Sequence, residues 1–170
     1  MGSVCYNIAF TMTSSFFLPP SHDHQHCIAT ALQTAASLCH HHGLRLTDMH
    51  RLVLERIWRR HVPVGAYNLL DSLRAEGHNV HPPTIYRALE FLLRHGLIHR
   101  ISHMKAYIGC TRPGHAHHFL ICRSCHVVAE IDDPALDTAI AQVTAGAGFT
   151  TEGETMLEIA GLCAHCWKDA

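Results

Sequence analysis

Four of the chain's eight cysteines fall into two C-x-x-C pairs, a spacing at which thiolates commonly bind a metal ion together. The pairs are Cys122 with Cys125 and Cys163 with Cys166. Four thiolates around one tetrahedral Zn²⁺ make a closed structural site, because no coordination position remains for a substrate. The long interval between the pairs adds a modest cost, since loop-closure entropy grows only logarithmically with loop length. The pattern predicts a four-cysteine zinc site and a protein that is not an enzyme.

A dithiol redox centre and a pair of disulfide bonds are the other roles open to these cysteines. A redox-active C-x-x-C begins a helix, where its thiolate is activated, and the sequence pattern places neither pair there. Disulfides form in oxidising compartments, but residues 1–20 lack the basic leading segment and the cleavage site of an export signal. No apolar run reaches the roughly 20 residues that cross a bilayer. We therefore expect a cytoplasmic protein with reduced thiols and no membrane association.

A second set of metal-ligating residue types lies between positions 99 and 130. Its members are His99, Cys110, His115, His117, His118 and Glu130. One thiolate with imidazoles and a carboxylate suits Zn²⁺, whereas carboxylates and imidazoles alone suit iron or manganese better. Each residue also has an ordinary interpretation: surface histidines, a core cysteine, and a carboxylate paired with Arg123. On the residues alone, both interpretations stay open.

The elements that must position these residues follow from the spacing of apolar side chains. Helical spacing marks residues 28–42, 48–61, 65–76 and 82–96. Thr47 is an expected N-cap, and Gly43 and Gly96 are expected to end helices. After Gly96 the period changes to two over residues 97–102 and 105–110, which predicts a β-hairpin. Helices followed by such a hairpin make a winged helix.

The remainder of the chain predicts a small α/β unit. Its pattern is two strands from His117, a helix over residues 134–144, and a strand over residues 155–163. The expected fold class is therefore α+β, with an N-terminal winged helix and a small α/β domain that carries the four-cysteine zinc site; the family resemblance described below implies that the first is a DNA-binding domain and the second a dimerization domain. The expected boundaries are a flexible leader at 1–27, the winged helix at 28–110, a hinge at 111–116 and the second domain at 117–170.

The start of the helix over residues 82–96 is the candidate surface for an anionic partner. Residues 1–100 hold nine Arg and no Lys against six acidic residues, whereas residues 101–170 hold four basic and eight acidic residues. Thr84, Tyr86 and Arg87 lie at the N-terminus of this helix, where a recognition helix meets base edges, and Arg can pair bidentately with guanine. The alternative is an ordinary solvated helix face.

Several segments resemble the ferric uptake regulator (Fur) family of bacterial metal-responsive transcription factors, over about residues 28–167. They are "LRLTDMHRLVLERI", "AYNLLDSLR", "PPTIYRALEFLLRHGLIHRI" and "FLICRSCHVVAEID". The "PTIYRAL" motif followed by a four-cysteine pattern is the most specific part of the likeness. Within the family, "LIHR", the Cys at the end of "YIGC" and "GLCAHC" resemble the zinc uptake regulator (Zur) branch.

The resemblance implies a homodimeric repressor of zinc-uptake genes that binds double-stranded DNA at an inverted repeat when zinc is bound. It implies about two Zn²⁺ per subunit. The structural ion would be bound by Cys122, Cys125, Cys163 and Cys166. The regulatory ion would be bound by His99, Cys110, His115 and Glu130, with His117 as the alternate ligand. Tyr86 and Arg87 would read DNA, and Asp71 and Arg74 could pair charges between two dimers on one operator or within their own helix.

One position departs from the wider family pattern. Iron, peroxide and nickel sensors commonly carry H-x-H just before the first C-x-x-C, but here Phe119 stands three residues before Cys122. This difference puts an iron or peroxide function in doubt. An iron or peroxide sensor of the same family, or a zinc-buffering protein that uses its 18 histidines as independent ligands, remains the alternative.

Overall fold

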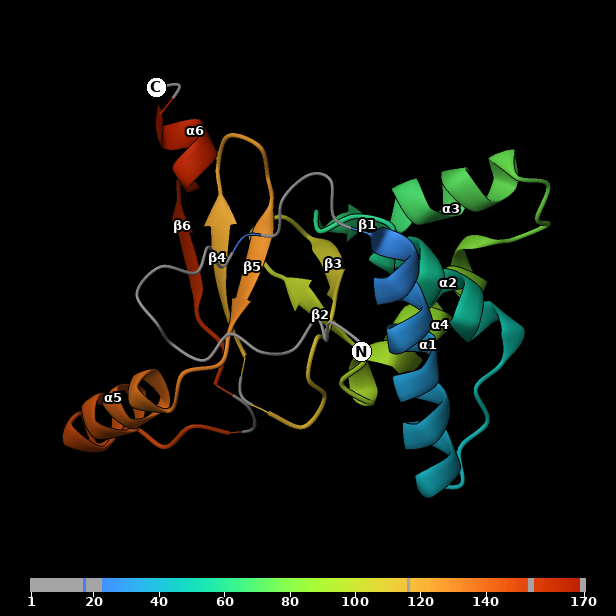
Figure 1. Ribbon diagram of the computed structural model, residues 1–170. Helices are drawn as coiled ribbons and strands as arrows, with labels where there is room; N and C mark the ends of the chain where they lie inside the picture. Colours follow the sequence, from blue (N-terminus) through green and yellow to red (C-terminus); the bar gives the residue numbers. More distant parts are fainter. Residues whose placement is uncertain (1–16, 18–22, 116, 153–154, 169–170) are drawn as a thin grey trace, which may run out of the picture. The chain divides into compact units, whose positions relative to one another are not determined.

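The computed structural model describes residues 17, 23–115, 117–152 and 155–168. They form two compact units that divide between Pro113 and Gly114. Figure 1 labels the helices and strands of each unit. Most of the expected leader, residues 1–16 and 18–22, lies outside the described residues. Among the described helices, none is both long enough and apolar enough to cross a membrane.

The first unit has the helix and strand order of a winged helix. Its elements are α1 (His24–His41), α2 (Asp48–Trp58), β1 (Val64–Gly65), α3 (Ala66–Ala75), α4 (Pro82–Arg94), β2 (Ile98–Ile101) and β3 (Ala106–Gly109). The strands form an antiparallel sheet in the order β1-β3-β2. The helices and the hairpin agree with the prediction, but the two-residue strand β1 was not expected, since so short a strand has no period to detect.

Local capping explains where the helices begin and end. The Thr47 hydroxyl accepts the N–H of His50, and His50 Nδ1 accepts the N–H of Thr47, so a capping box starts α2 as predicted. Gly43 has a φ of +62°, which suits a helix end. Helix α1 begins four residues earlier than expected because the Asp23 carboxylate accepts the N–H of Gln25.

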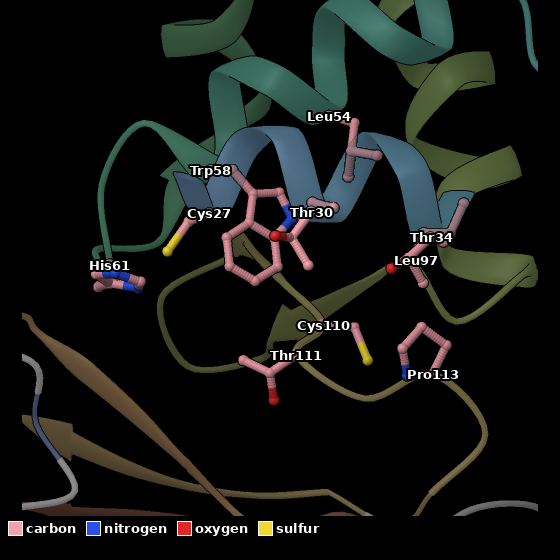
Figure 2. Close-up of a pocket in the computed structure, with 11 residues that line it drawn as sticks. Cys27, Thr30, Thr34, Leu54, Trp58, His61, Leu97, Cys110, Thr111 and Pro113 are labelled. Atoms are coloured by element: carbon pink, nitrogen blue, oxygen red, sulfur yellow. The ribbon is translucent and has the colours of Figure 1, made fainter. Parts of the chain in front are cut away.

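An apolar core joins all four helices of the first unit to the hairpin. Its fully buried members include Val53, Leu54, Ile57, Leu69, Leu73, Ile85, Leu89, Leu92 and Ile98. Trp58, at the end of α2, lies so close to Gly109 of β3 that a Cβ there would be 2.2 Å from the indole. Trp58 also lines a small pocket with Thr30 of α1 (Figure 2). These contacts fix the hairpin directly against α2.

The second unit is a three-stranded sheet with two helices. Its elements are β4 (His118–Cys122), β5 (Val128–Ile131), α5 (Pro134–Gly146), β6 (Glu158–Gly161) and α6 (Ala164–Lys168). The sheet order is β5-β4-β6, in which β4 runs antiparallel to β5 and parallel to β6. The five-residue helix α6 was not predicted, because its first residues belong to the second C-x-x-C and carry no apolar period.

Burial in the second unit is sparse. Neither α5 nor α6 has a buried residue, and the buried apolar side chains are confined to the sheet and to Cys163. Helix α5 is joined to the sheet by a hydrogen bond between Asp137 and the fully buried His118. Val143 and Phe149 are exposed at and just beyond the end of this helix. The unit therefore has little apolar core of its own.

Candidate functional site

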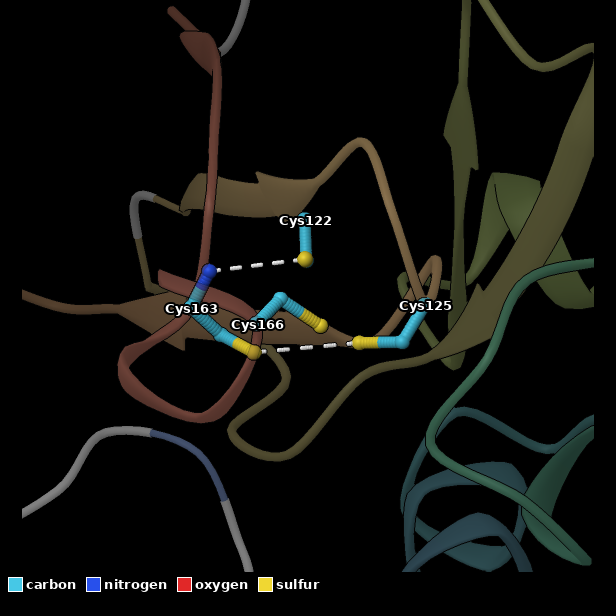
Figure 3. Close-up of side chains that lie close together, drawn as sticks. All are labelled: Cys122, Cys125, Cys163 and Cys166. Atoms are coloured by element: carbon cyan, nitrogen blue, oxygen red, sulfur yellow. Dashed lines mark hydrogen bonds between the residues drawn. The ribbon is translucent and has the colours of Figure 1, made fainter. Parts of the chain in front are cut away.

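The sheet of the second unit brings the two C-x-x-C pairs together. Cys122 ends β4, and Cys125 lies in the turn that leads to β5. Because β4 and β6 are parallel and Cys122 is in register with Gly161, the segment that carries Cys163 and Cys166 emerges beside the first pair. The four sulfur atoms all lie within 4.8 Å of one another (Figure 3). All four predicted structural ligands thus lie in one cluster.

Hydrogen bonds to this cluster favour the thiolate most strongly at Cys122. The N–H of Cys163 donates to Cys122 Sγ at 3.4 Å. Burial raises the pKa of Cys122, but the backbone N–H groups of Cys125, Cys163 and Ser124 outweigh it and lower the pKa to about 6. Val127's backbone N–H lowers the pKa of Cys125, whereas burial and the neighbouring thiols raise it to about 12.

This charge balance is what a metal site requires. Four thiols this close together cannot all ionise without a cation, and a soft or borderline divalent ion can bind all four thiolates at once. None of the four cysteines is in a disulfide, and Cys125 Sγ lies 3.8 Å from Cys163 Sγ. The donor set fits a tetrahedral Zn²⁺.

The expectation that neither C-x-x-C pair begins a helix was wrong for the second pair. Cys163 directly precedes α6, so this pair does stand at the start of a short helix. A redox pair, however, uses two sulfurs and leaves the other two crowded against it without a role. The clustering of four sulfurs still favours metal binding.

A carboxylate and a histidine pair inside the second unit. In the β4–β5 register Phe119 lies opposite Glu130, so His117, two residues before Phe119, projects to the same face as Glu130. His117 Nδ1 forms an ion pair with Glu130 Oε1, and the two side chains are only 3% and 9% exposed. Buried imidazole and carboxylate groups this close together can bind one cation jointly.

The other two histidines of this segment lie elsewhere. His118 points to the opposite face, where its Nδ1 accepts the N–H of Leu157 at 3.2 Å and its Nε2 lies 3.0 Å from Asp137 Oδ1. Both of its ring nitrogens are thus engaged. His115 is half exposed, with Nδ1 4.0 Å from Asp132 Oδ2. Of the three candidates, His117 is the one beside Glu130.

The first unit carries the other two predicted regulatory ligands. His99 on β2 is paired with Ile108 of β3, and the N–H of Cys110 donates to the Leu97 carbonyl at 3.0 Å, which continues the ladder. Residues on one face of a hairpin alternate, so His99 and Cys110 project from the same face as diagonal neighbours. Both are buried. A thiol and an imidazole at this spacing can bind one metal ion together.

The start of α4 presents polar side chains to solvent. Thr84, Tyr86 and Arg87 are exposed, whereas Ile85, Ala88 and Leu89 are buried. Tyr67, near the start of α3, is 67% exposed. Desolvation raises the pKa of Tyr86, and the neighbouring Tyr67 and Tyr107 raise it further. The sequence analysis missed Tyr67, because only the packing of α3 on α4 brings it near Tyr86.

The sequence from just before α2 into β6 matches one known family. A model of the ferric uptake regulator family matches residues 41–159. The chain belongs to this family. The match covers most of the first unit and the second unit as far as β6.

Several relatives and solved structures that resemble this Fur-family chain are zinc regulators. The zinc uptake regulation protein of Escherichia coli K12 is 33% identical over 138 residues, which are 79% of this chain and 80% of that protein. A zinc uptake regulator solved with zinc and DNA is 30% identical, with a TM-score of 0.74 over 88% of this chain and 98% of that one. Holo XcZur is 34% identical, with a TM-score of 0.73 over 82% and 98% of the two chains.

Proposed function

We propose that this family member is a zinc-responsive, sequence-specific DNA-binding transcriptional regulator that mainly represses zinc-uptake genes when zinc is bound. The principal support is its likeness, across 88% of its length, to a regulator that has been solved with zinc and DNA together. The four-sulfur cluster and the exposed start of α4 supply the metal-binding and DNA-binding chemistry. We assign the chain no catalytic activity, and its reduced thiols suit the cytoplasm.

The structural Zn²⁺ of this proposal is bound by Cys122, Cys125, Cys163 and Cys166. It joins the turn after β4 to the segment after β6 and so stabilises a unit whose helices bury nothing. Structural zinc contributes on the order of 10 kcal/mol to the folding of small domains. In this site the ion has no role in sensing.

The regulatory Zn²⁺ would take its ligands from both units. We propose His99 and Cys110 from the first, and Glu130 with His117 from the second. His117 replaces His115 in this assignment because it is buried and already contacts Glu130, whereas His115 is half exposed beside Asp132. Cys110 makes the set softer than an iron site, which favours Zn²⁺.

Zinc at such a site would regulate DNA binding by restricting the segment over residues 111–116, which we propose as a hinge between a winged helix at 28–110 and a dimerization domain at 117–170. A ligand shifts a conformational equilibrium only as far as it binds one state better than another. Four ligands shared between two domains are complete only in some orientations, so zinc selects those orientations.

We further propose a two-fold homodimer on an inverted-repeat operator. The exposed Val143, Phe149 and Ile159 of the second unit offer apolar surface for a second copy. On DNA, Arg87 and Tyr86 would contact bases, and Tyr67 would support Tyr86 or contact phosphate. Asp71 is exposed and could pair charges between two dimers; Arg74 lies three residues along the same helix, with its Nε bound to the Val80 carbonyl.

The decisive experiment measures operator affinity across a buffered zinc series together with metal content per subunit. Cys110→Ser removes a Zn–S bond with little change in shape, so the zinc at the four-cysteine site should persist while zinc-dependent DNA binding is lost or shifted to much higher free zinc. Cys39→Ser, another buried cysteine of the first unit, is the matched control and should respond as the wild type.

Three outcomes would overturn parts of this proposal. A Cys110→Ser protein that binds less zinc yet keeps the wild-type response would remove this site from sensing. Equal activation of the wild type by ferrous iron and zinc at matched free concentrations would favour an iron sensor of the same family. Zinc uptake at many sites with no effect on DNA affinity would favour a zinc-buffering protein.

A further inference from the structure

We propose that the winged-helix unit binds a further Zn²⁺ through His24, Cys27 and His61, separate from the two ions considered above. His24 and Cys27 stand three residues apart in the first turn of α1, so their side chains lie on one face of the helix. The segment that holds them, "HDHQHC", is one of the histidine-rich stretches for which the regulatory function has no use.

The third ligand comes from a distant part of the unit. His61 lies in the turn between α2 and β1, and its ring centroid is 5.0 Å from that of His24. His61 and Cys27 line the same pocket, and Figure 2 shows the Cys27 thiol and the His61 ring at one end of it, with Trp58 beside them. The indole of Trp58 packs edge-on to His61 at 6.4 Å between centroids.

Two imidazoles and one thiolate make a donor set that Zn²⁺ prefers. At least one pair of the three donor atoms is more than 4.8 Å apart, so binding draws the side chains together by rotation. His24 and His61 are only partly buried. With three protein ligands, a water molecule would complete the tetrahedral coordination of Zn²⁺.

The placement of the site gives it a consequence for the DNA-binding unit. It would tie the first turn of α1 to the turn that precedes β1 and α3. Three protein ligands and a need for rotation predict weaker binding than at four preformed thiolates. The site would therefore fill after the four-cysteine site and would stiffen the winged helix only when zinc is abundant.

Metal content of the full chain provides the first test. Zinc per subunit is measured by mass spectrometry after equilibration with a series of zinc buffers. His61→Ala and Cys27→Ser should each bind one ion fewer than the wild type at high free zinc. His26→Ala and Cys39→Ser are the controls, because they change an exposed histidine and a second buried cysteine of the same helix, and both should bind as the wild type.

A spectroscopic test reports the site directly. Co²⁺ is added to protein that holds only its structural and regulatory Zn²⁺, in a Trp167→Phe background, so that Trp58 is the remaining tryptophan. We expect thiolate-to-cobalt charge-transfer absorption and quenching of Trp58 fluorescence, both lost in His61→Ala and retained in His26→Ala. Thermal unfolding is measured in the presence of a chelator. Equal melting temperatures for His61→Ala and the wild type would exclude a folding defect in this variant. The test then holds even if Cys27→Ser, which changes a buried residue, misfolds.

Unchanged metal content and unchanged Trp58 quenching in His61→Ala would overturn the proposal. Equal loss in His26→Ala would also overturn it, because scattered histidines would then be binding metal adventitiously. Neither readout involves DNA. The experiments can therefore contradict the further site while zinc-dependent operator binding persists, and they can support it while operator binding does not respond to zinc.

Discussion

The winged-helix unit and the C-terminal unit are stabilised by different interactions. The first packs apolar residues from four helices and a hairpin into one continuous core. The second buries a few sheet residues, and its two helices contribute none. Four thiols gather where apolar side chains would otherwise be needed. Under the proposal, the DNA-reading surface therefore belongs to a unit with an apolar core of its own, whereas the second unit would depend on its metal for stability.

This difference has a functional meaning under the proposed mechanism. A sensor must keep its DNA-reading surface intact when the regulatory ion leaves, and an apolar core does so. The structural ion must then stay bound while the regulatory ion exchanges. A closed shell of four thiolates provides that retention, whereas a mixed set with two histidines and a carboxylate binds more weakly and exchanges.

The largest expected effect is the loss of the second unit in Cys125→Ser. Removal of one thiolate weakens a metal site that contributes on the order of 10 kcal/mol to folding. We expect the β4–β6 sheet to unfold while the first unit keeps its structure. Amide spectra of the two units by NMR, with zinc content, provide the measurement.

The matched control for that change is Cys39→Ser, which alters a buried cysteine of the first unit. It should leave the structural zinc and the second unit unchanged. If Cys125→Ser kept both its zinc and the spectrum of the second unit, the contrast between the units would be wrong.

The corresponding test of the first unit is Leu89→Ala in α4, which should destabilise that unit and leave the second unchanged. Leu89 is 1% exposed in the middle of the core, so its truncation should lower the free energy of unfolding of the first unit by roughly 2–5 kcal/mol. Denaturant titration followed by Trp58 fluorescence measures this loss. The zinc content should not change, and a simultaneous loss of zinc would show that the two units fold as one.

A smaller effect is expected from Arg87→Ala, which should alter DNA reading without altering the stability of either unit. Loss of a bidentate base contact costs roughly 1–3 kcal/mol and relaxes preference at one position of each half-site. Arg94→Ala is the control, because Arg94 lies at the other end of α4 and pairs with Glu90 at 2.9 Å. Equal weakening on all DNA sequences would make Arg87 a phosphate contact instead.

The smallest effect concerns pH. Burial is the main cause that lowers the pKa of His50 below 6.5, with His95 adding to it and a backbone hydrogen bond of Arg45 opposing it. A lowered folded pKa means that the neutral ring stabilises the fold above pH 6.5 and that this stabilisation is lost as pH falls through the folded value. Protonated Nδ1 can no longer accept the Thr47 N–H of the capping box.

His50→Gln keeps a hydrogen-bond acceptor and removes the titration. The melting temperature of the first unit should therefore fall less between about pH 7.5 and 5.5 in the variant than in the wild type. Trp58 fluorescence in a Trp167→Phe background confines the readout to this unit. Parallel curves for the two proteins would show that the cap does not titrate in this range.

Sequence could predict the elements whose signals are local. Thr47, Gly43 and Gly96 mark helix ends through their own backbone chemistry, and α4 and the hairpin are placed by apolar period. The four-sulfur cluster could also be predicted, because the residue type and spacing of two C-x-x-C pairs indicate a metal site directly. The short β1 and α6 carry too few residues for a period, and the start of α1 depends on a single carboxylate, Asp23.

Pairings across the sheet could not be read from the sequence. His115, His117 and His118 are the same residue type within four positions of the sequence. Only the β4–β5 register shows that His117 faces Glu130 and that His118 faces Asp137. The approach of Tyr67 to Tyr86 and of His61 to His24 likewise depends on how helices pack. Such contacts join residues far apart in the chain.

The parallel pairing of β4 with β6 sets an order for synthesis of the protein on the ribosome. Every residue of the winged-helix core is synthesised before Cys122, so that unit can fold while translation continues. The second unit must wait, because β6 and Cys166 arrive long after β4 and Cys125. During this interval two thiols are open to solvent and to passing metal ions, so nascent chains should be most sensitive to oxidants between these two points of translation.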